Sequence, residues 1–305
     1  MTIFFALLAK LIPLYIIIGL GFIAGRYLHV RKESIAPLVM YILSPMIVFN
    51  AALTTTITMS TLTLPILLFT LACLVCITFF FLGHFFWHDT TRNILAFAAG
   101  NGNTGYFGIP VAIILFSPKL VNIYIFGILG LSLYQNSLGF FIAAKGHYTV
   151  QETLLKVAKL PSLYAFFIGL LFNLVELHLG STYVDTVTNF RGAYTILGMM
   201  IIGLGLASIT SYKFDFKFIC IAFFARFLVW PALMLLVITV NTALKIYDPN
   251  IYKVMILSSI VPLAADTVTF ATQLNAQPEK ASLAVLLSTV FALFYIPLIS
   301  AFFLR

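Results

Sequence analysis

Long apolar runs separated by short polar connections follow one another along the whole chain. A bilayer core requires about 20 apolar residues per helix. The runs cover residues 4–25, 35–54, 62–86, 93–117, 121–144, 160–178, 190–209, 217–243, 252–275 and 281–304. The first is longer than the apolar core of a signal peptide and contains Lys10, so we interpret it as a retained helix. The pattern predicts an all-α polytopic membrane protein with ten transmembrane helices.

Composition agrees with this pattern. Hydrophobic residues make up 62% of the 305-residue chain and charged residues only 9%, against about 25% in soluble domains. This excludes a soluble enzyme, a nucleic-acid-binding domain and a disulfide scaffold. Cys73 and Cys76 lie inside an apolar run without a nearby histidine, so we expect no metal site there.

The net charge of +8 is informative about orientation, because Lys and Arg gather in cytoplasmic loops. Connections after odd-numbered spans contain Arg26, Arg31, Lys32, Arg92, Lys145, Lys156, Lys159, Lys213, Lys217 and Lys280. The opposite side contains Lys119, Arg191, Lys245, Lys253 and Arg305. The bias predicts that both termini lie outside.

The most polar connection, residues 145–159, follows the fifth span. Five is an odd number, so a duplicated second half would enter the membrane from the opposite side. Inverted repeats of this kind are a common construction of secondary transporters. We therefore predict two inverted five-helix repeats, residues 1–150 and 151–305.

Two spans are interrupted. Residues 98–110 contain four glycines and Pro110. Inside a helix each Gly costs about 1 kcal/mol and each Pro about 3 kcal/mol relative to Ala. Residues 258–270 contain Pro262 followed by the polar Asp266 and Thr267. Ordinary Pro or Gly kinks are the alternative. Interruptions at matching positions of two halves, however, indicate a substrate site. Half-helix N-termini there would favour an anion, and carbonyl ends a cation.

The fourth-span segment Asn101–Pro110 resembles the signature of the auxin efflux carrier family, and residues 43–50, 204–208 and 226–231 support the resemblance over the whole chain. The resemblance implies a fold similar to bile-acid symporters and sodium/proton antiporters. In such folds spans 1, 2, 6 and 7 form a scaffold domain. Spans 3–5 and 8–10 form a transport domain, which moves by an elevator mechanism and whose broken helices 4 and 9 cross at the substrate.

Bacterial members of this family resemble malate or malonate permeases, and plant members export auxin. The resemblance therefore implies a small organic anion as substrate and a plasma membrane location, the inner membrane in a bacterium. Asn103 and Pro110 match the family's crossover residues, and Pro262 matches the first proline of its ninth-span motif. Thr267 stands where plant carriers have a second proline, and the acid Asp266 is a further departure, so auxin itself is disfavoured.

The expected substrate-binding residues lie at the two interruptions and in neighbouring spans. They are Asn50, Asn103, Thr104, Gly105, Pro110, Asn136, Pro262 and Thr267. Asn50 and Asn136 have interhelical hydrogen bonding as their alternative role. An acid at membrane depth usually faces a cavity or a partner, so Asp266 is the candidate for proton coupling, with Na⁺ ligation or helix N-capping as alternatives. For Arg226 we expect snorkelling or pairing rather than substrate contact.

These residues predict a secondary transporter of small carboxylates that works by alternating access. We expect no cofactor, H⁺ as the coupling ion with Na⁺ or uncoupled transport as alternatives, membrane lipid as surroundings and no nucleic acid partner. A homodimer through the scaffold helices is an open alternative to a monomer. A membrane substrate sensor is the second functional class. An intramembrane enzyme is disfavoured, because it would need paired acids, a metal cluster or a nucleophile with its base.

Overall fold

The computed structural model describes residues 2–144, 150–177, 179–208 and 214–303. Expected loop cations Lys145 and Lys213, together with Arg305, lie outside this part. The elements of the first half are α1 (Thr2–Tyr27), α2 (Lys32–Leu38), η1 (Val39–Leu43), α3 (Ser44–Thr54), α4 (Met59–His84), α5 (Thr91–Gly100), η2 (Thr104–Gly108), α6 (Ile109–Leu115), α7 (Pro118–Tyr134), η3 (Gln135–Gly139) and α8 (Phe140–Ala143). The second half contains α9 (Val150–Ala158), α10 (Pro161–Leu174), α11 (Ser181–Ala207), α12 (Phe216–Phe224), η4 (Ala225–Val229), α13 (Trp230–Leu244), α14 (Pro249–Ile260), α15 (Asp266–Gln273) and α16 (Pro278–Phe303). The η elements are single π-helical turns within longer helices.

The described part is all-helical, and seven of its helical segments are long and apolar enough to cross a membrane. They are Phe4–Tyr27, Lys32–Thr54, Met59–His84, Pro118–Ala143, Ser181–Ala207, Phe216–Leu244 and Pro278–Phe303. The protein is therefore a polytopic membrane protein, as expected. Of the other expected spans, α10 has only 14 residues, and the two interrupted spans are divided into shorter helices. The count of ten stays a prediction.

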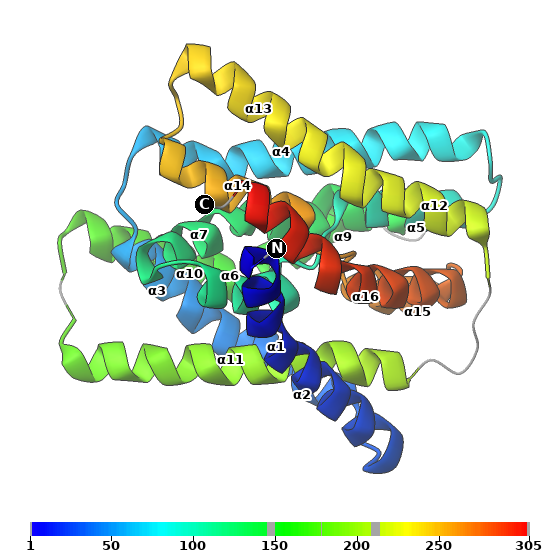
Figure 1. Ribbon diagram of the computed structural model, residues 1–305, viewed down its shortest axis with the longest axis horizontal. Helices are drawn as coiled ribbons and strands as arrows, with labels where there is room; N and C mark the ends of the chain where they lie inside the picture. The colour runs from blue at the N-terminus through cyan, green and yellow to red at the C-terminus, as the bar shows by residue number, and fades with distance from the viewer. Residues whose placement is uncertain (1, 145–149, 178, 209–213, 304–305) are drawn as a thin grey trace.

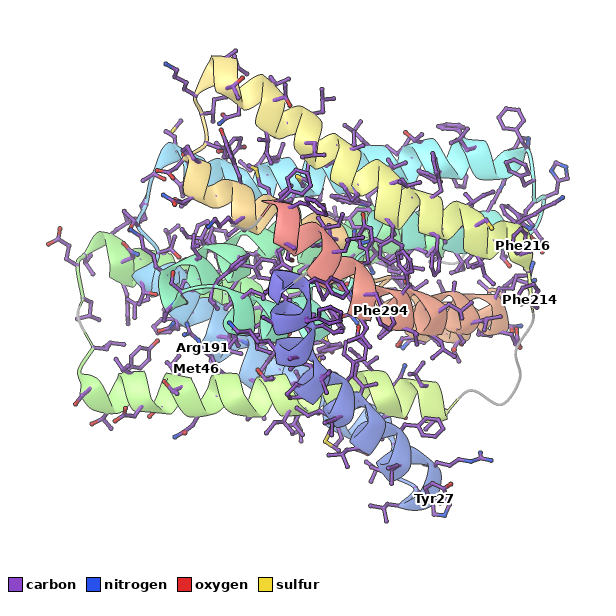
Figure 2. The ribbon with its side chains drawn as sticks, viewed as in Figure 1. Tyr27, Met46, Arg191, Phe214, Phe216 and Phe294 are labelled. Atoms are coloured by element: carbon purple, nitrogen blue, oxygen red, sulfur yellow. The ribbon has the colours of Figure 1, made fainter. Side chains whose placement is uncertain are left out.

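Large apolar side chains cover the outer surface. Tyr27 at the end of α1, Phe214 and Phe216 at the start of α12, and Phe294 on α16 are all more than half exposed (Figure 2). In water such a surface would be unfavourable, but lipid chains are as apolar as these side chains. The exposed aromatic side chains are consistent with a helical bundle surrounded by lipid.

Several helical connections lie at two opposite ends of the molecule (Figure 1). In Figure 1 the α4–α5 and α15–α16 connections, the end of α11 and the start of α12 are at the right. The α3–α4, α10–α11 and α13–α14 connections are at the left (Figure 1). The right-hand end thus carries connections after odd-numbered expected spans, which we call the odd-loop end. The left-hand end is the even-loop end.

Helix starts follow from local chemistry. Thr58 and Thr61 form a reciprocal capping box at the start of α4, with the Thr61 amide donating to Thr58 Oγ1 at 3.2 Å. Asp215 Oδ1 accepts from the Phe218 amide at 3.0 Å at the start of α12. These bonds satisfy donors that the first turn of a helix leaves free.

Small residues allow α1 and α11 to pack closely. A Cβ on Gly21 would collide with the Met200 carbonyl, and one on Gly203 would collide with the Ile18 carbonyl. Gly21 of α1 therefore serves packing within the chain.

Candidate functional site

The fourth expected span is interrupted where its glycines and asparagines lie. Helix α5 ends at Gly100, and the chain then runs in non-helical conformation until η2 begins at Thr104. In the ninth expected span, α14 ends at Ile260 and α15 begins at Asp266. The two interruptions expected from Gly and Pro are present.

The two interrupted segments cross in the interior and pair with each other. The Asn103 amide donates to the Pro262 carbonyl at 2.8 Å, and the Ala264 amide donates to the Asn101 carbonyl at 3.2 Å. Gly102 and Leu263 form the antiparallel bridge between these bonds. Unwound backbone inside a membrane protein must have its polar groups satisfied, and here each segment satisfies the other.

Side chains from the expected fifth and eighth spans bind the carbonyl groups at the ends of α5 and α14. Trp230 Nε1 donates to the Ala99 carbonyl at 2.7 Å, and the Tyr134 hydroxyl donates to Phe97 at 3.2 Å. Arg226 closes the end of α14, as Nε donates to Val261 and Nη2 to Ser258, both at 2.6 Å.

The position of Arg226 excludes snorkelling, one of the two roles expected for its side chain. The side chain is fully buried and forms its hydrogen bonds at the crossing of the two interruptions. The snorkelling alternative was wrong because distance along the span does not reveal which face of the helix a residue occupies. No pattern in the sequence other than an Arg within an apolar run signalled this role.

The N-terminal half-helix ends carry different groups. Asn103 Oδ1 accepts from the Phe107 amide at 3.2 Å and thereby caps η2. Asp266 is the first residue of α15, but it does not act as its N-cap, which is Ala265. The Asp266 carboxylate instead accepts a hydrogen bond from Gln135 Nε2 at 2.9 Å. The capping alternative for Asp266 is therefore not what the structure contains.

Four buried polar atoms near the crossing have no hydrogen-bond partner among the described residues. They are Asn101 Nδ2, Asn103 Nδ2, Arg226 Nη1 and Thr267 Oγ1. Three of them are N–H donors without acceptor capacity. Buried donors without partners are costly, so this set favours a ligand or water that supplies acceptor oxygens.

A cavity of about 980 Å³ begins at the crossing. Its lining there includes Gly102, Asn103, Thr104, Gly105 and Asp266. Tyr106, Gln135, Asn136 and Tyr194 contribute further polar groups. The cavity lies between α2, η1, α3 and α11 on one side and α7, η3, α15 and α16 on the other.

The cavity extends to the odd-loop end. Its lining includes Ser208 at the end of α11 and Glu279 at the start of α16, which lie at that end. The exposed residues Glu33 and Lys159 also line it and lie beside connections that follow odd-numbered expected spans. The lining contains no described residue from the α3–α4, α10–α11 or α13–α14 connections. The cavity is therefore open towards one end of the molecule and closed towards the other.

Five of the nine expected site residues line this cavity: Asn103, Thr104, Gly105, Asn136 and Asp266. The other four, Asn50, Pro110, Pro262 and Thr267, are buried outside its lining. Asn136 Nδ2 bonds the Ser132 carbonyl within its own helix at 2.9 Å. Proximity to an interruption in the sequence does not decide on which side of the crossing a side chain lies.

Lys32 was missed as a site residue because the sequence only assigned it to a basic loop. Its Nζ lies 2.7 Å from Thr269 Oγ1 and lines the cavity. Thr269 follows Asp266 by three positions on α15, so both occupy one helix face. Lys32 thus places a positive charge on the wall of the cavity opposite α15.

A polar cluster joins three helices on the closed side of the molecule. Asn122 Nδ2 on α7 donates to Thr54 Oγ1 on α3 at 2.7 Å. Arg191 Nη2 on α11 donates to Asn122 Oδ1, and Arg191 lies where α11 passes α3 (Figure 2). This cluster links α7 to two helices across the closed end of the cavity.

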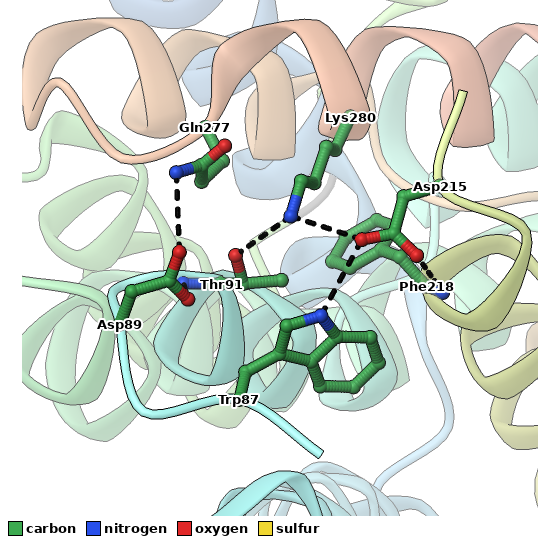
Figure 3. A network of polar contacts seen from close by, with 7 residues as sticks. All are labelled: Trp87, Asp89, Thr91, Asp215, Phe218, Gln277 and Lys280. Carbon is green, nitrogen blue, oxygen red and sulfur yellow. Dashed lines mark hydrogen bonds and ion pairs between the residues drawn. The ribbon is translucent and has the colours of Figure 1, made fainter. Parts of the chain in front are cut away.

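A second polar network lies at the odd-loop end (Figure 3). Lys280 Nζ lies 2.9 Å from Asp215 Oδ2 and 3.1 Å from Thr91 Oγ1. Trp87 Nε1 is 3.4 Å from the same Asp215 oxygen. These contacts connect the starts of α5, α12 and α16.

Comparison with known families tests the family resemblance of the fourth-span segment. Residues 6–300 match the family model described as membrane transport protein. The chain belongs to the auxin efflux carrier family. As a member of this family it is a membrane transport protein. A comparison with curated proteins gave no match.

Proposed function

We propose that this auxin efflux carrier family member is a secondary transporter of small organic anions, above all carboxylates. The observation that carries the proposal is a cavity ending at two crossed interruptions beside buried N–H donors without partners. A carboxylate offers several acceptor lone pairs to such donors. Asn103 lines the cavity and has a free Nδ2, so its amide is the residue most directly suited to contact the anion.

Two further features support an anionic ligand. The N-terminal end of α15 contributes partial positive charge at the crossing, and Lys32 supplies a full positive charge at the cavity wall. Acidic Asp266 opposes them, and Gln135 donates a hydrogen bond to it. In this proposal Asp266 exchanges a proton during the cycle, with Na⁺ coupling and uncoupled transport as the alternatives.

Alternating access would be a movement of α4–α8 and α12–α16 against the scaffold of α1–α3, α10 and α11. Among the described residues few hydrogen bonds cross the proposed boundary, which favours such movement. They are Lys32 to Thr269, Tyr15 to the Thr289 carbonyl at 2.7 Å, and the Asn122 cluster. Since Lys and Arg are enriched at the odd-loop end, the cavity in this conformation would face the cytoplasm. Ten spans in two inverted repeats, a plasma membrane location and a dimer through the scaffold remain parts of the proposal.

Counterflow in proteoliposomes tests the proposal. Vesicles are preloaded with unlabelled malate, malonate, succinate or an indole acid, and entry of the same labelled acid is followed. Counterflow requires no driving gradient, so it reports a carrier whatever its coupling ion. We expect transient accumulation of at least one acid, and its loss in Asn103→Ala.

The matched control is Asn189→Ala, because Asn189 is exposed on α11 and lies outside the cavity lining. This variant should retain most of the exchange. Binding of an acid by the folded wild-type protein without any counterflow would favour a membrane sensor instead. Unchanged exchange in Asn103→Ala would remove the crossing from the substrate site.

A further inference from the structure

One face of the eighth expected span serves both interruptions. Arg226 and Trp230 are four positions apart, so they project from the same side of the helix. Arg226 donates to the carbonyls at the end of α14, and Trp230 donates to the carbonyl of Ala99 at the end of α5. Both side chains are fully buried. The two carbonyl ends that meet at the crossing are therefore bound by neighbouring side chains of one helix.

Carbonyl ends of helices carry partial negative charge, which a cation stabilises. At a helix end in the interior of a membrane protein, a bound metal ion or a cationic side chain can supply this charge. Here the Arg226 guanidinium occupies the position, with two hydrogen bonds of 2.6 Å to main-chain oxygens. Main-chain oxygens are also the ligands that hard cations prefer, so the guanidinium uses the groups that a metal ion would need.

The guanidinium is held firmly in this place. It lies over the Trp230 ring with its central carbon 5.2 Å from the ring centroid, a cation–π arrangement. A Cβ on Gly102 would collide with the same carbon, so the unwound segment passes directly against it. Among the described residues Arg226 forms no ion pair with a carboxylate. Its charge acts on the crossing itself.

We propose that Arg226 is the resident cation of the crossing and takes the place of a metal ion, so that the site binds its ligand without Na⁺. Arg226 is a positioning residue in this proposal: it binds and neutralises the carbonyl end of α14, and its guanidinium lies directly against Gly102 of the other interruption. The inference goes beyond the proposed transport of organic anions and can be tested without any transport. It also makes a proton, rather than Na⁺, the coupling ion to be expected if the carrier is coupled.

Thermal unfolding of the purified full-length protein tests this directly. Tryptophan fluorescence is followed in NaCl and in choline chloride at equal ionic strength, for wild type, Arg226→Lys, Arg226→Met and the exposed control Arg31→Met. We expect the wild-type Tm to be the same in both salts. Arg226→Met should lower Tm by several degrees, because it leaves two buried carbonyls without a donor. Arg226→Lys should recover part of the loss, and Arg31→Met should resemble wild type.

Two results would overturn the proposal. One is a saturable rise of the wild-type Tm with Na⁺ but not with choline, which would demonstrate a Na⁺ site. The other is an Arg226→Met variant as stable as wild type. If Arg226→Met does not fold, the wild-type salt comparison and Arg226→Lys still decide the question. Counterflow in sodium-free choline medium adds a functional arm, where wild-type exchange should stay within about twofold of its rate in sodium, a difference of less than 0.5 kcal/mol.

A failure of the proposed function is distinguishable from a failure of this inference. Suppose that counterflow is absent in both sodium and choline medium, while the wild-type Tm is the same in the two salts. This result would contradict transport of the tested acids and leave the role of Arg226 supported. Counterflow that requires Na⁺ would support transport and contradict the role of Arg226.

Discussion

The amide of Asn103 donates to the carbonyl of Pro262 at 2.8 Å, joining residues from opposite halves of the chain. Proline has no amide proton, but its carbonyl remains an acceptor. The interruption of one helix is thereby satisfied by the interruption of the other. Neither would be stable alone inside a membrane, because unpaired backbone groups there cost several kcal/mol each. Each interrupted segment therefore needs the other to satisfy its backbone hydrogen bonds.

Gly102→Ala tests how tightly the crossing is packed. The new methyl group would collide with the Arg226 guanidinium, which is held by two hydrogen bonds and cannot move away easily. Overpacking of this kind costs about 1–3 kcal/mol, so we expect a lower Tm and loss of ligand exchange. Gly19→Ala is the matched control, because a Cβ there meets no atom within 4 Å. It should leave Tm unchanged or raise it. Equal stability of both variants would contradict the close approach at Gly102.

Asp266→Asn tests proton coupling. A pH gradient of one unit stores about 1.4 kcal/mol per proton, enough for about tenfold accumulation of a coupled substrate. Asn mimics the protonated acid and can still accept a hydrogen bond from Gln135, so we expect counterflow to persist while accumulation driven by the pH gradient disappears. Radiolabelled uptake with and without the gradient measures both. Glu33→Gln, an exposed acid in the same cavity lining, should keep gradient-driven uptake. Gradient-driven accumulation that survives in Asp266→Asn would assign coupling elsewhere.

Asn122→Ala tests the closed side of the cavity. The substitution removes the bridge between Thr54 and Arg191. A hydrogen bond to a charged group contributes about 1.5–3 kcal/mol, so the equilibrium should shift about ten- to hundredfold towards opening at the even-loop end. The measurement is labelling of Ser132→Cys, in a background without native cysteines, by an impermeant maleimide added at that end. We expect labelling to rise. Thr188→Ala, whose exposed hydroxyl bonds only within α11, is the control and should have no effect.

The Asp215–Lys280 network predicts a pH dependence of stability. Partial burial acts to raise the pKa of Asp215, but hydrogen bonds from Lys280 and the Phe218 amide, with the charge of Lys280, outweigh it and hold the pKa below its ordinary value. A carboxyl with a lowered pKa stabilises the fold above its unfolded pKa of about 4, and this contribution is lost as the pH falls through the folded pKa. We expect Tm to fall on acidification from about pH 6 to about pH 3.

The comparison variant for this prediction is Asp215→Asn. It should have a lower Tm than wild type near neutral pH and a smaller further loss on acidification. Asp185→Asn changes an exposed acid on α11 and should follow the wild-type curve. Parallel curves for wild type and Asp215→Asn would show that the carboxylate contributes nothing through its ionisation.

The local features of this protein follow from its sequence. Apolar runs of membrane length predict the helices because a bilayer admits almost no other structure. The interruptions are predictable because Gly and Pro act on the backbone at their own positions, as at Gly102 and Pro262. Family membership also follows from the sequence, since the residues around Asn103 carry its signature. Whether the chain forms ten spans in two inverted repeats remains a prediction.

The membership of the candidate site was decided only by the tertiary structure. Asn50 and Thr267 were expected in it, yet both are buried outside the cavity lining. Lys32 was assigned to a loop, yet it lines the cavity. For Arg226 snorkelling or pairing was expected, and the structure shows its side chain bound to main-chain carbonyls at the crossing. The physical reason is that composition and spacing fix how a segment folds along its own axis. Which face of a helix meets which partner depends on how residues distant in the chain pack together, and only the folded molecule determines that.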